Sequence, residues 1–305
     1  MASRRGAVPS GADRHGETRR RSFMKLAGKS AVVTGAGSGI GRGIALAFAD
    51  AGTNVVVVDI EGAKAEAVAA EVAARGVRSS SFAADVRDPA AVAAMADHGW
   101  SALGRIDILC NNAGVCLTGP GFDISDTDFR WQLDVNVVGV FNGMREFGRR
   151  FREQGGPAWI VSTGSHHSIG APTKGIAAYV ASKHAVLGLS EAFRTEYGPA
   201  IGVGVLCPGI VNTSIWDAGR NRPAEYGGKV SGDPRNQQAM LDLGMNPERV
   251  GQLVAAGIEN EDFYIWTHPQ DLDLIEKRYA EGRDTITRQW PDGPTAEHKM
   301  TPHEV

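Results

Sequence analysis

The chain has 305 residues, of which 42% are hydrophobic and 22% are charged, and its formal net charge is −3. This length and apolar content are enough to bury a large core, and the acidic balance argues against a nucleic-acid partner for the folded part. No window reaches about 18 consecutive apolar residues, so the sequence predicts no membrane span. The three cysteines are too few and too scattered for a disulfide framework or a zinc site.

The first 25 residues form a basic extension with a net charge of +5, which leaves −8 for the remainder. The extension contains RRSFMK at positions 20–25, which is similar to a twin-arginine export signal. Such a signal needs an apolar segment, whereas the following LAGKSAVVTG already begins the first expected strand. We therefore expect a flexible extension at 1–25, a folded domain at 26–285 and a cytoplasmic protein.

A glycine-rich turn follows the first strand-like run. The sequence TGAGSGIG, at positions 34–41, leads directly into a helix-length segment. Glycines here permit a tight turn and let backbone N–H groups at a helix N-terminus approach a pyrophosphate. The pattern predicts that a dinucleotide contacts the following residues of the turn: Gly35, Ser38, Gly39, Ile40 and Gly41.

The next apolar run, NVVVVD, ends at Asp59, about 20 residues after the glycines, where a carboxylate can accept hydrogen bonds from both ribose hydroxyls. The same carboxylate repels a 2′-phosphate, and no arginine stands beside Asp59 and Ile60 in the sequence. Arg42, at the start of the preceding helix, is expected to face solvent or a backbone phosphate. The cofactor predicted is NAD rather than NADP.

Strand-like and helix-length segments alternate along the chain. The strand-like runs are AVVTG, NVVVVD, SSFAAD, IDILC, AWIVS, GVGVLC and FYIWT. This alternation predicts one α/β domain, a Rossmann-type doubly wound parallel sheet of about seven strands with helices on both faces. A helix at 247–260 precedes the last strand, a short helix at 272–283 follows it, and a polar tail is expected at 286–305.

Tyr179 and Lys183 are spaced i, i+4 in AAYVASKHAVLGLSEAFRTEYG, a stretch without proline and rich in helix formers. On a helix their side chains lie on one face, one turn apart. A cation about 4 Å from a phenol is worth roughly 4 kcal/mol at an effective dielectric near ~20, before desolvation is counted. The pair predicts a phenolate within reach near about pH 7, able to exchange a proton with an alkoxide.

Five motifs occur in an order typical of one enzyme family: TGxxxGxG, NNAG at 111–114, the asparagine of DVNVVGV, YxxxK and the PG dipeptide at 208–209. Over residues 26–267 the chain resembles the short-chain dehydrogenase/reductase family. The resemblance implies that Tyr179 is the general acid or base and that Lys183 binds the nicotinamide ribose and lowers the pKa of Tyr179. It also implies that Asn136 kinks a helix expected at 126–151 and holds a water that links the lysine to solvent.

The family also has a serine that polarises the substrate oxygen. Ser165 lies one residue farther from Tyr179 than that serine does, and His166 stands at the family distance. Ser165 is preferred because TGS ends the strand expected at 160–162 and a loop can absorb the extra residue. Ser168 and an inward-facing His166 remain alternatives.

The remaining cofactor contacts are implied by the resemblance alone. Asp85, followed by Val86, would contact the adenine amine, and Thr213 would hydrogen-bond the nicotinamide carboxamide. The NNAG turn would form the floor beneath the adenine ribose, and the PG turn would pack beside the nicotinamide; these residues are Asn111, Asn112, Ala113, Gly114, Pro208, Gly209 and Ile210. No metal is required, and the histidines share no ligand spacing.

The segment at 212–245 falls where the family has its substrate lid. Trp216, Tyr226 and Met240, with Ile169 and Leu117, either line an apolar cavity suited to an aromatic or alicyclic secondary alcohol or pack the lid on the body. The later stretches RPAEYG and MNPERVGQLVAAGIENEDFYIWTHP resemble a subgroup that includes the Cα-dehydrogenases of lignin aryl-ether catabolism.

The predicted function is hydride transfer between NAD and a bulky cyclic or aromatic secondary alcohol or its ketone. Two alternatives remain open: a ketone reductase that uses NADH, and a non-catalytic regulator that binds a dinucleotide. The expected partners are a small-molecule substrate and further copies of the chain, in a homotetramer or dimer, with no nucleic acid and no membrane. By the resemblance, the helices carrying Asn136 and Tyr179 would pair across two-fold axes.

Overall fold

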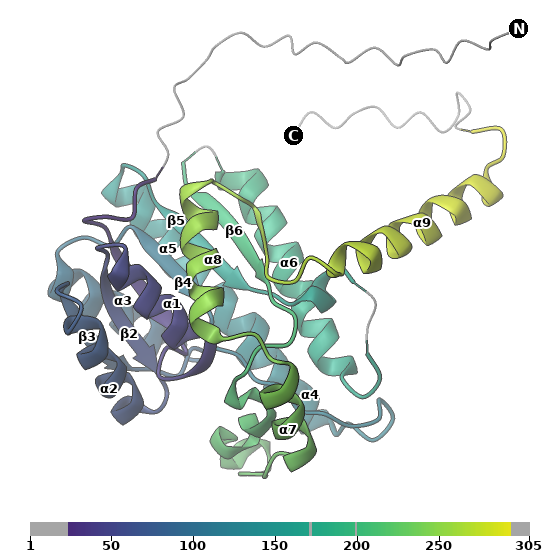
Figure 1. Ribbon diagram of the computed structural model, residues 1–305, viewed down its shortest axis with the longest axis horizontal. Coiled ribbons are helices and arrows are strands. Elements are labelled where there is room, and N and C mark those ends of the chain that lie inside the picture. Colours follow the sequence, from purple (N-terminus) through teal and green to yellow (C-terminus); the bar gives the residue numbers. More distant parts are fainter. Residues whose placement is uncertain (1–23, 171–172, 199, 294–305) are drawn as a thin grey trace, which may run out of the picture.

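The computed structural model describes residues 24–170, 173–198 and 200–293 (Figure 1). The predictions for residues 1–23 and 294–305 therefore lie outside the described residues. Met24 is 5% exposed and Leu26 is 1% exposed, and both belong to the core. The packed domain thus includes at least two residues ahead of the predicted boundary at 26.

One parallel sheet of seven strands organises the described chain, in the order β3-β2-β1-β4-β5-β6-β7. This confirms the predicted fold class. The strands are short and apolar because both faces of the sheet are covered. Their bounds are β1 Ser30–Thr34, β2 Asn54–Asp59, β3 Ser79–Ala83, β4 Ile108–Asn111, β5 Trp159–Thr163, β6 Gly202–Cys207 and β7 Tyr264–Trp266.

Helices cover the two faces in two groups. One apolar cluster joins one face of the sheet to α1, α2 and α8, and a second joins the other face to α3, α5 and α6. Figure 1 shows α1 and α8 side by side in front of the sheet. The bounds are α1 Gly39–Asp50, α2 Gly62–Ala73, α3 Pro89–Leu103, α5 Gly139–Gln154, α6 Ala177–Tyr197 and α8 Pro247–Glu259.

Two helices differ from the prediction. The helix expected at 126–151 consists of α4 Asp126–Leu133, a π-helical turn at Asp134–Val138 and α5, so the expected bend is a π-turn centred on Asn136. The C-terminal helix α9 spans Asp271–Gln289, longer than the predicted 272–283 and into the predicted tail. Its far end projects away from the body (Figure 1).

The strand order reverses between β1 and β4, the switch point at which ligands bind in open α/β sheets. The predicted lid, residues 212–245, contains two short 3-10 segments, Ser214–Asn221 and Ala224–Tyr226, and helix α7 Pro234–Leu243. A bridge between Val211 and Met245 closes its base. Among the described helices, none combines the length and the apolar character needed to cross a bilayer.

Candidate active site

A cavity of about 820 Å³ opens at the switch point. It brings together almost all predicted contact residues: Gly35, Ser38, Gly39, Ile40, Asp59, Ile60, Asp85, Val86, Asn112, Ala113, Gly114, Ser165, Tyr179, Lys183, Pro208, Gly209, Ile210 and Thr213. Gly41 and Asn136 lie behind its wall and support it. Residues that are up to 178 positions apart in the sequence thus share one site.

The glycine-rich turn is built for a close approach of backbone to ligand. Gly35 has a φ of +63°, and a Cβ added there would lie 2.8 Å from the Cα of Ala113. A Cβ added at Gly41 would lie 2.3 Å from the carbonyl oxygen of Gly35. Ser38 makes no side-chain capping bond to α1, whose first turn has no acidic residue, so its N–H groups and positive dipole end suit a phosphate.

Asp59 ends β2 with its carboxylate held by backbone. Its Oδ2 accepts from the N–H of Gly37 at 2.9 Å, and its Oδ1 accepts from the N–H of Glu61 at 3.0 Å. Each oxygen keeps a second lone pair for a ribose hydroxyl. These features together fit the adenosine half of a dinucleotide.

Arg42 faces away from this corner, since its guanidinium donates to Glu71 and Glu248. No arginine stands beside Asp59 in the sequence, but the fold brings one into the cavity that Asp59 lines. Arg220, from the lid, lines the same cavity and places its Nε 3.3 Å from Oε1 of Glu61. The sequence separates these two residues by 159 positions, so neighbouring letters could not reveal the contact.

Asp85 lines the cavity, but its carboxylate is also held by Arg87, whose N–H and Nε each lie 3.0 Å from Oδ1. An adenine amine would have to share this carboxylate with Arg87. Asn111 differs from the prediction: its Oδ1 lies 2.1 Å from the position of a Cβ on Gly143 of α5, so its side chain faces that helix. Asn112 lines the cavity in its place and donates to the carbonyl of Thr34 at 3.0 Å.

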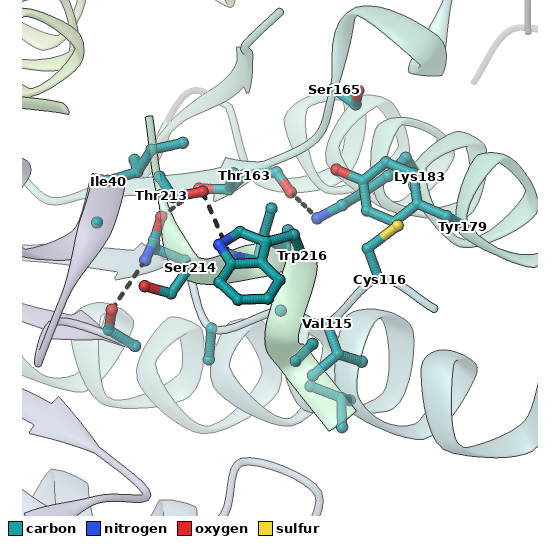
Figure 2. A pocket seen from close by; sticks show the side chains of 18 of the residues that line it. Ile40, Val115, Cys116, Thr163, Ser165, Tyr179, Lys183, Thr213, Ser214 and Trp216 are labelled. Atoms are coloured by element: carbon teal, nitrogen blue, oxygen red, sulfur yellow. Dashed lines mark hydrogen bonds between the residues drawn. The ribbon is translucent and has the colours of Figure 1, made fainter. Parts of the chain in front are cut away.

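Tyr179 and Lys183 lie one turn apart on α6 and face the cavity together (Figure 2). The Nζ of Lys183 is 5.5 Å from the centre of the Tyr179 ring and donates to the carbonyl of Thr163 at 2.7 Å. Their juxtaposition is as the spacing predicted.

The protonation of the pair differs from the prediction. Burial raises the pKa of the Tyr179 hydroxyl well above its ordinary value, and a hydrogen bond from Ser165 opposes this only in part. Burial also lowers the pKa of Lys183 to about 8, so this lysine loses its positive charge at a lower pH than an ordinary lysine does. Desolvation therefore outweighs the ion pair in the protein alone, and a neutral phenol prevails near neutral pH.

Ser165, rather than its neighbours, contacts the tyrosine. It caps the 3-10 turn His166–Ser168, its Oγ accepts from the N–H of His167 at 3.2 Å, and its hydroxyl is close enough to lower the pKa of Tyr179. Ser168 points away and donates to the carbonyl of Lys183 at 2.8 Å. The ring nitrogens of His166 lie 3.1 Å from Asp271 and 3.0 Å from His167, so neither is left for a substrate oxygen.

Asn136 is fully buried inside the π-turn. Its Oδ1 accepts from the N–H of Val115 at 2.8 Å, and its Nδ2 donates to the carbonyl of Val115 and to Oγ of Ser182, each at 2.9 Å. The amide thereby fixes the loop segment at Val115, which continues into Cys116 in the cavity wall.

The sequence left open whether the apolar lid residues line the cavity or pack the lid on the body, and the structure shows some of each. Trp216 and Met240 line the cavity, and Figure 2 shows Trp216 between Thr213 and Val115. Tyr226 instead packs in a cluster with Leu117 and donates its hydroxyl to Asp134 at 2.7 Å. Ile169 belongs to a separate buried cluster.

Some residues of the site were not singled out from the sequence. Thr163 accepts from Lys183, Ser182 accepts from Asn136, and Glu61 holds Arg220. Cys116 lines the cavity beside Tyr179, and burial raises its pKa to about 12 (Figure 2). Of these residues, only Glu61 could have been found from its place in the sequence, because it lies two residues after Asp59.

Known proteins share both the sequence and this arrangement. The model of the short chain dehydrogenase family matches residues 29–223. Oxidoreductase UcpA of Escherichia coli is 36% identical over 79% of this chain and 91% of its own length. The C alpha-dehydrogenase of Sphingobium sp. is 32% identical over 88% of this chain and 90% of its own.

Among solved structures, a short chain dehydrogenase/reductase from Burkholderia phymatum in complex with NAD superposes with a TM-score of 0.81 at 32% identity. The match covers 86% of this chain and 96% of that one. The matched region contains the glycine-rich turn, Asp59, Asn136, Ser165, Tyr179 and Lys183. The chain therefore belongs to the short-chain dehydrogenase/reductase family and is an oxidoreductase of that family.

Proposed function

We propose that this enzyme is an NAD-dependent dehydrogenase of a bulky secondary alcohol, cyclic or aromatic, and that Tyr179 is its acid and base. The observation that carries the proposal is the convergence of Tyr179, Lys183 and Ser165 on the cavity that Asp59 also lines. Bound NAD supplies a carbon that accepts hydride and, in its oxidised form, a positive charge.

In its phenolate form, Tyr179 would take the hydroxyl proton of the alcohol and become a neutral phenol, as the carbinol hydrogen leaves as hydride. Ser165 holds the substrate oxygen: its Oγ already accepts from the N–H of His167, so its own hydrogen can point to that oxygen. One N–H of Lys183 donates to the carbonyl of Thr163, and its other N–H groups can donate to ribose hydroxyls. Since burial alone raises the pKa of Tyr179, the phenolate needs a positive charge beside it, which ties proton removal to the oxidised cofactor.

The cofactor preference rests on Asp59, whose carboxylate suits two ribose hydroxyls and repels a 2′-phosphate. The structure from Burkholderia phymatum, which is in complex with NAD, supports the same choice. The substrate class rests on the lining contributed by Trp216, Met240, Ile176 and Cys116. The relative named C alpha-dehydrogenase supports an aromatic secondary alcohol.

We also propose that the chain assembles as a homotetramer or a dimer. Val138 and Phe141, at the junction of the π-turn and α5, are each 39% exposed, an unusual position for large apolar side chains. Pairing of this region with a second copy would cover them.

Tyr179→Phe tests the proposed chemistry. The variant should lose turnover of a panel of aryl and alicyclic secondary alcohols by about a hundredfold or more, because general acid–base catalysis typically contributes that much. NADH affinity, measured by fluorescence titration, should stay within about twofold, since Phe keeps the ring that lines the cavity.

If Tyr179→Phe turned over alcohols at the wild-type rate, Tyr179 would not be the acid and base of the reaction. Wild-type protein that binds NADH but turns over no alcohol or ketone on the panel would favour the regulator. Oxidation that is undetectable while ketones are reduced with NADH would favour the reductase.

A further inference from the structure

Two cations lie near Asp59, and one of them, Arg220, lines the cavity. Arg220, on the 3-10 segment Ser214–Asn221 of the lid, lines the cavity with Asp59 and Ile60. Lys64 lies on the first turn of α2, and a Cβ on Gly37 would be 2.8 Å from the Cβ of Lys64 and 2.9 Å from Oδ2 of Asp59. Both cations therefore stand near the carboxylate that is proposed to hold the ribose.

Glu61 holds both cations. Its carboxylate lies 2.8 Å from Nζ of Lys64 and 3.3 Å from Nε of Arg220, and it also accepts from Nδ2 of Asn221 at 3.0 Å. Although burial works to raise it, the pKa of Glu61 falls to about 2 because of the bonds from Lys64 and Asn221 and the charge of Arg220. Glu61 is therefore ionised near neutral pH.

The guanidinium of Arg220 is fixed in this place. Its Nη1 donates to the carbonyl of Ser214 at 3.0 Å and to that of Asp217 at 2.9 Å. The other two arginines near the adenosine site are held elsewhere: Arg42 by Glu71, and Arg87 by Asp85. Among the described residues, the ion pairs of both Lys64 and Arg220 are formed with Glu61.

The charges at this corner almost cancel. Asp59 and Glu61 are matched by Lys64 and Arg220, so a 2′-phosphate would meet a neutral corner with Asp59 directly against it. Without Glu61, the same corner would carry one excess positive charge, with two donors released toward the ribose.

We propose that Glu61 is a second cofactor-specificity residue: by engaging Lys64 and Arg220, it keeps both cations from receiving a 2′-phosphate. The inference rests on the proposed preference for NAD and assigns part of that preference to a residue beyond Asp59. Because Arg220 lies on the lid, the lid would then contribute to the discrimination between NAD and NADP.

The test is direct binding of reduced cofactors to Glu61→Gln. Fluorescence titration at low ionic strength should show the Kd for NADPH falling by about tenfold, as charge-assisted contacts to the phosphate become available. The Kd for NADH should stay within about twofold. The gain should shrink with added salt, because both cations are partly exposed.

Two further variants keep the test interpretable. Glu66→Gln removes an equal charge from an exposed position on the same helix and should leave both Kd values unchanged. Glu61→Gln combined with Arg220→Gln should lose most of the gain, and a thermal melt will establish that each variant is folded.

An unchanged NADPH affinity in folded Glu61→Gln, with wild type preferring NADH, would overturn this inference and leave the proposed function standing. An equal gain in Glu66→Gln would overturn it as well, by showing only a general effect of net charge. Wild type that prefers NADPH would overturn both the proposed cofactor and this inference.

Discussion

Lys183 is a lysine whose positive charge the fold disfavours. The residue is 3% exposed, and burial lowers its pKa to about 8 from the ordinary 10.5. At pH values between these two pKa values, Lys183 is protonated in the unfolded chain and deprotonated in the folded protein. The free energy of unfolding should therefore rise with pH across this window, with a slope of up to about 1.4 kcal/mol per pH unit.

Lys183→Met isolates this contribution. We expect the wild type to gain stability relative to the variant as pH rises from about 8 toward 10.5, and the difference to be flat below about 8, where both states are protonated. Urea unfolding at several pH values measures it. The exposed Lys277→Met, on α9, should show no such slope, and a pH-independent difference for Lys183 would contradict the prediction.

At this scale the sequence was informative wherever one helix or one turn sets the geometry. The i, i+4 spacing placed Tyr179 and Lys183 together, and the glycines placed the turn. It was misleading about the pKa of Tyr179, because that depends on burial by Thr163, Cys116 and other residues from distant segments. Spacing shows which charges are near, whereas desolvation is a property of the assembled site.

The lid, residues 212–245, is attached to the body on both sides of the cleft. Arg220 reaches Glu61 on one side, while on the other Arg222 lies 2.7 Å from Asp128 of α4 and Tyr226 bonds to Asp134. The side chain of Arg222 is only 9% exposed, so its ion pair is better shielded from solvent than most surface pairs. We propose that one of these attachments breaks before a bound dinucleotide leaves.

Arg222→Gln should therefore release NADH faster, by about threefold to tenfold if the pair is worth roughly 1 kcal/mol. Stopped-flow displacement of NADH, followed by its fluorescence, measures the rate. Arg235→Gln is the matched control: Arg235 is also in the lid, but it pairs with Asp233 of the same segment. Equal release rates in all three proteins would show that this side of the lid does not limit release.

The resemblance predicts a lid at residues 212–245, but the contacts of this segment with the body could not be predicted from the sequence. The partners of Arg222 and Tyr226 lie about 90 or more positions away, on elements whose relative placement follows from the whole sheet. The bend in the helix at 126–151 was predicted through Asn136. Its π-helical form depends on bonds from Asn136 to Val115 and Ser182, which only the packed fold supplies.

At the scale of the whole molecule, two helix surfaces suit contact with a second copy. The junction of the π-turn and α5 exposes Val138 and Phe141, while the outer side of α6 exposes the small residues Ala181, Gly188 and Ala192. Small residues let another helix approach closely, and large apolar ones gain from being covered. This combination supports the proposed assembly, because neither surface is explained by packing within the protomer.

Gly188→Arg tests that assembly without disturbing the protomer. A Cβ at Gly188 would meet nothing within 4 Å, and replacing a helical glycine favours the helix. We expect wild type to run at two or four times the protomer mass of 32.3 kDa in light scattering, and Gly188→Arg at a smaller multiple. Gly282→Arg, on the projecting α9, also has open space and should leave the mass unchanged. A monomeric wild type would contradict the assembly, and a full-sized Gly188→Arg would exclude the α6 surface from its interface.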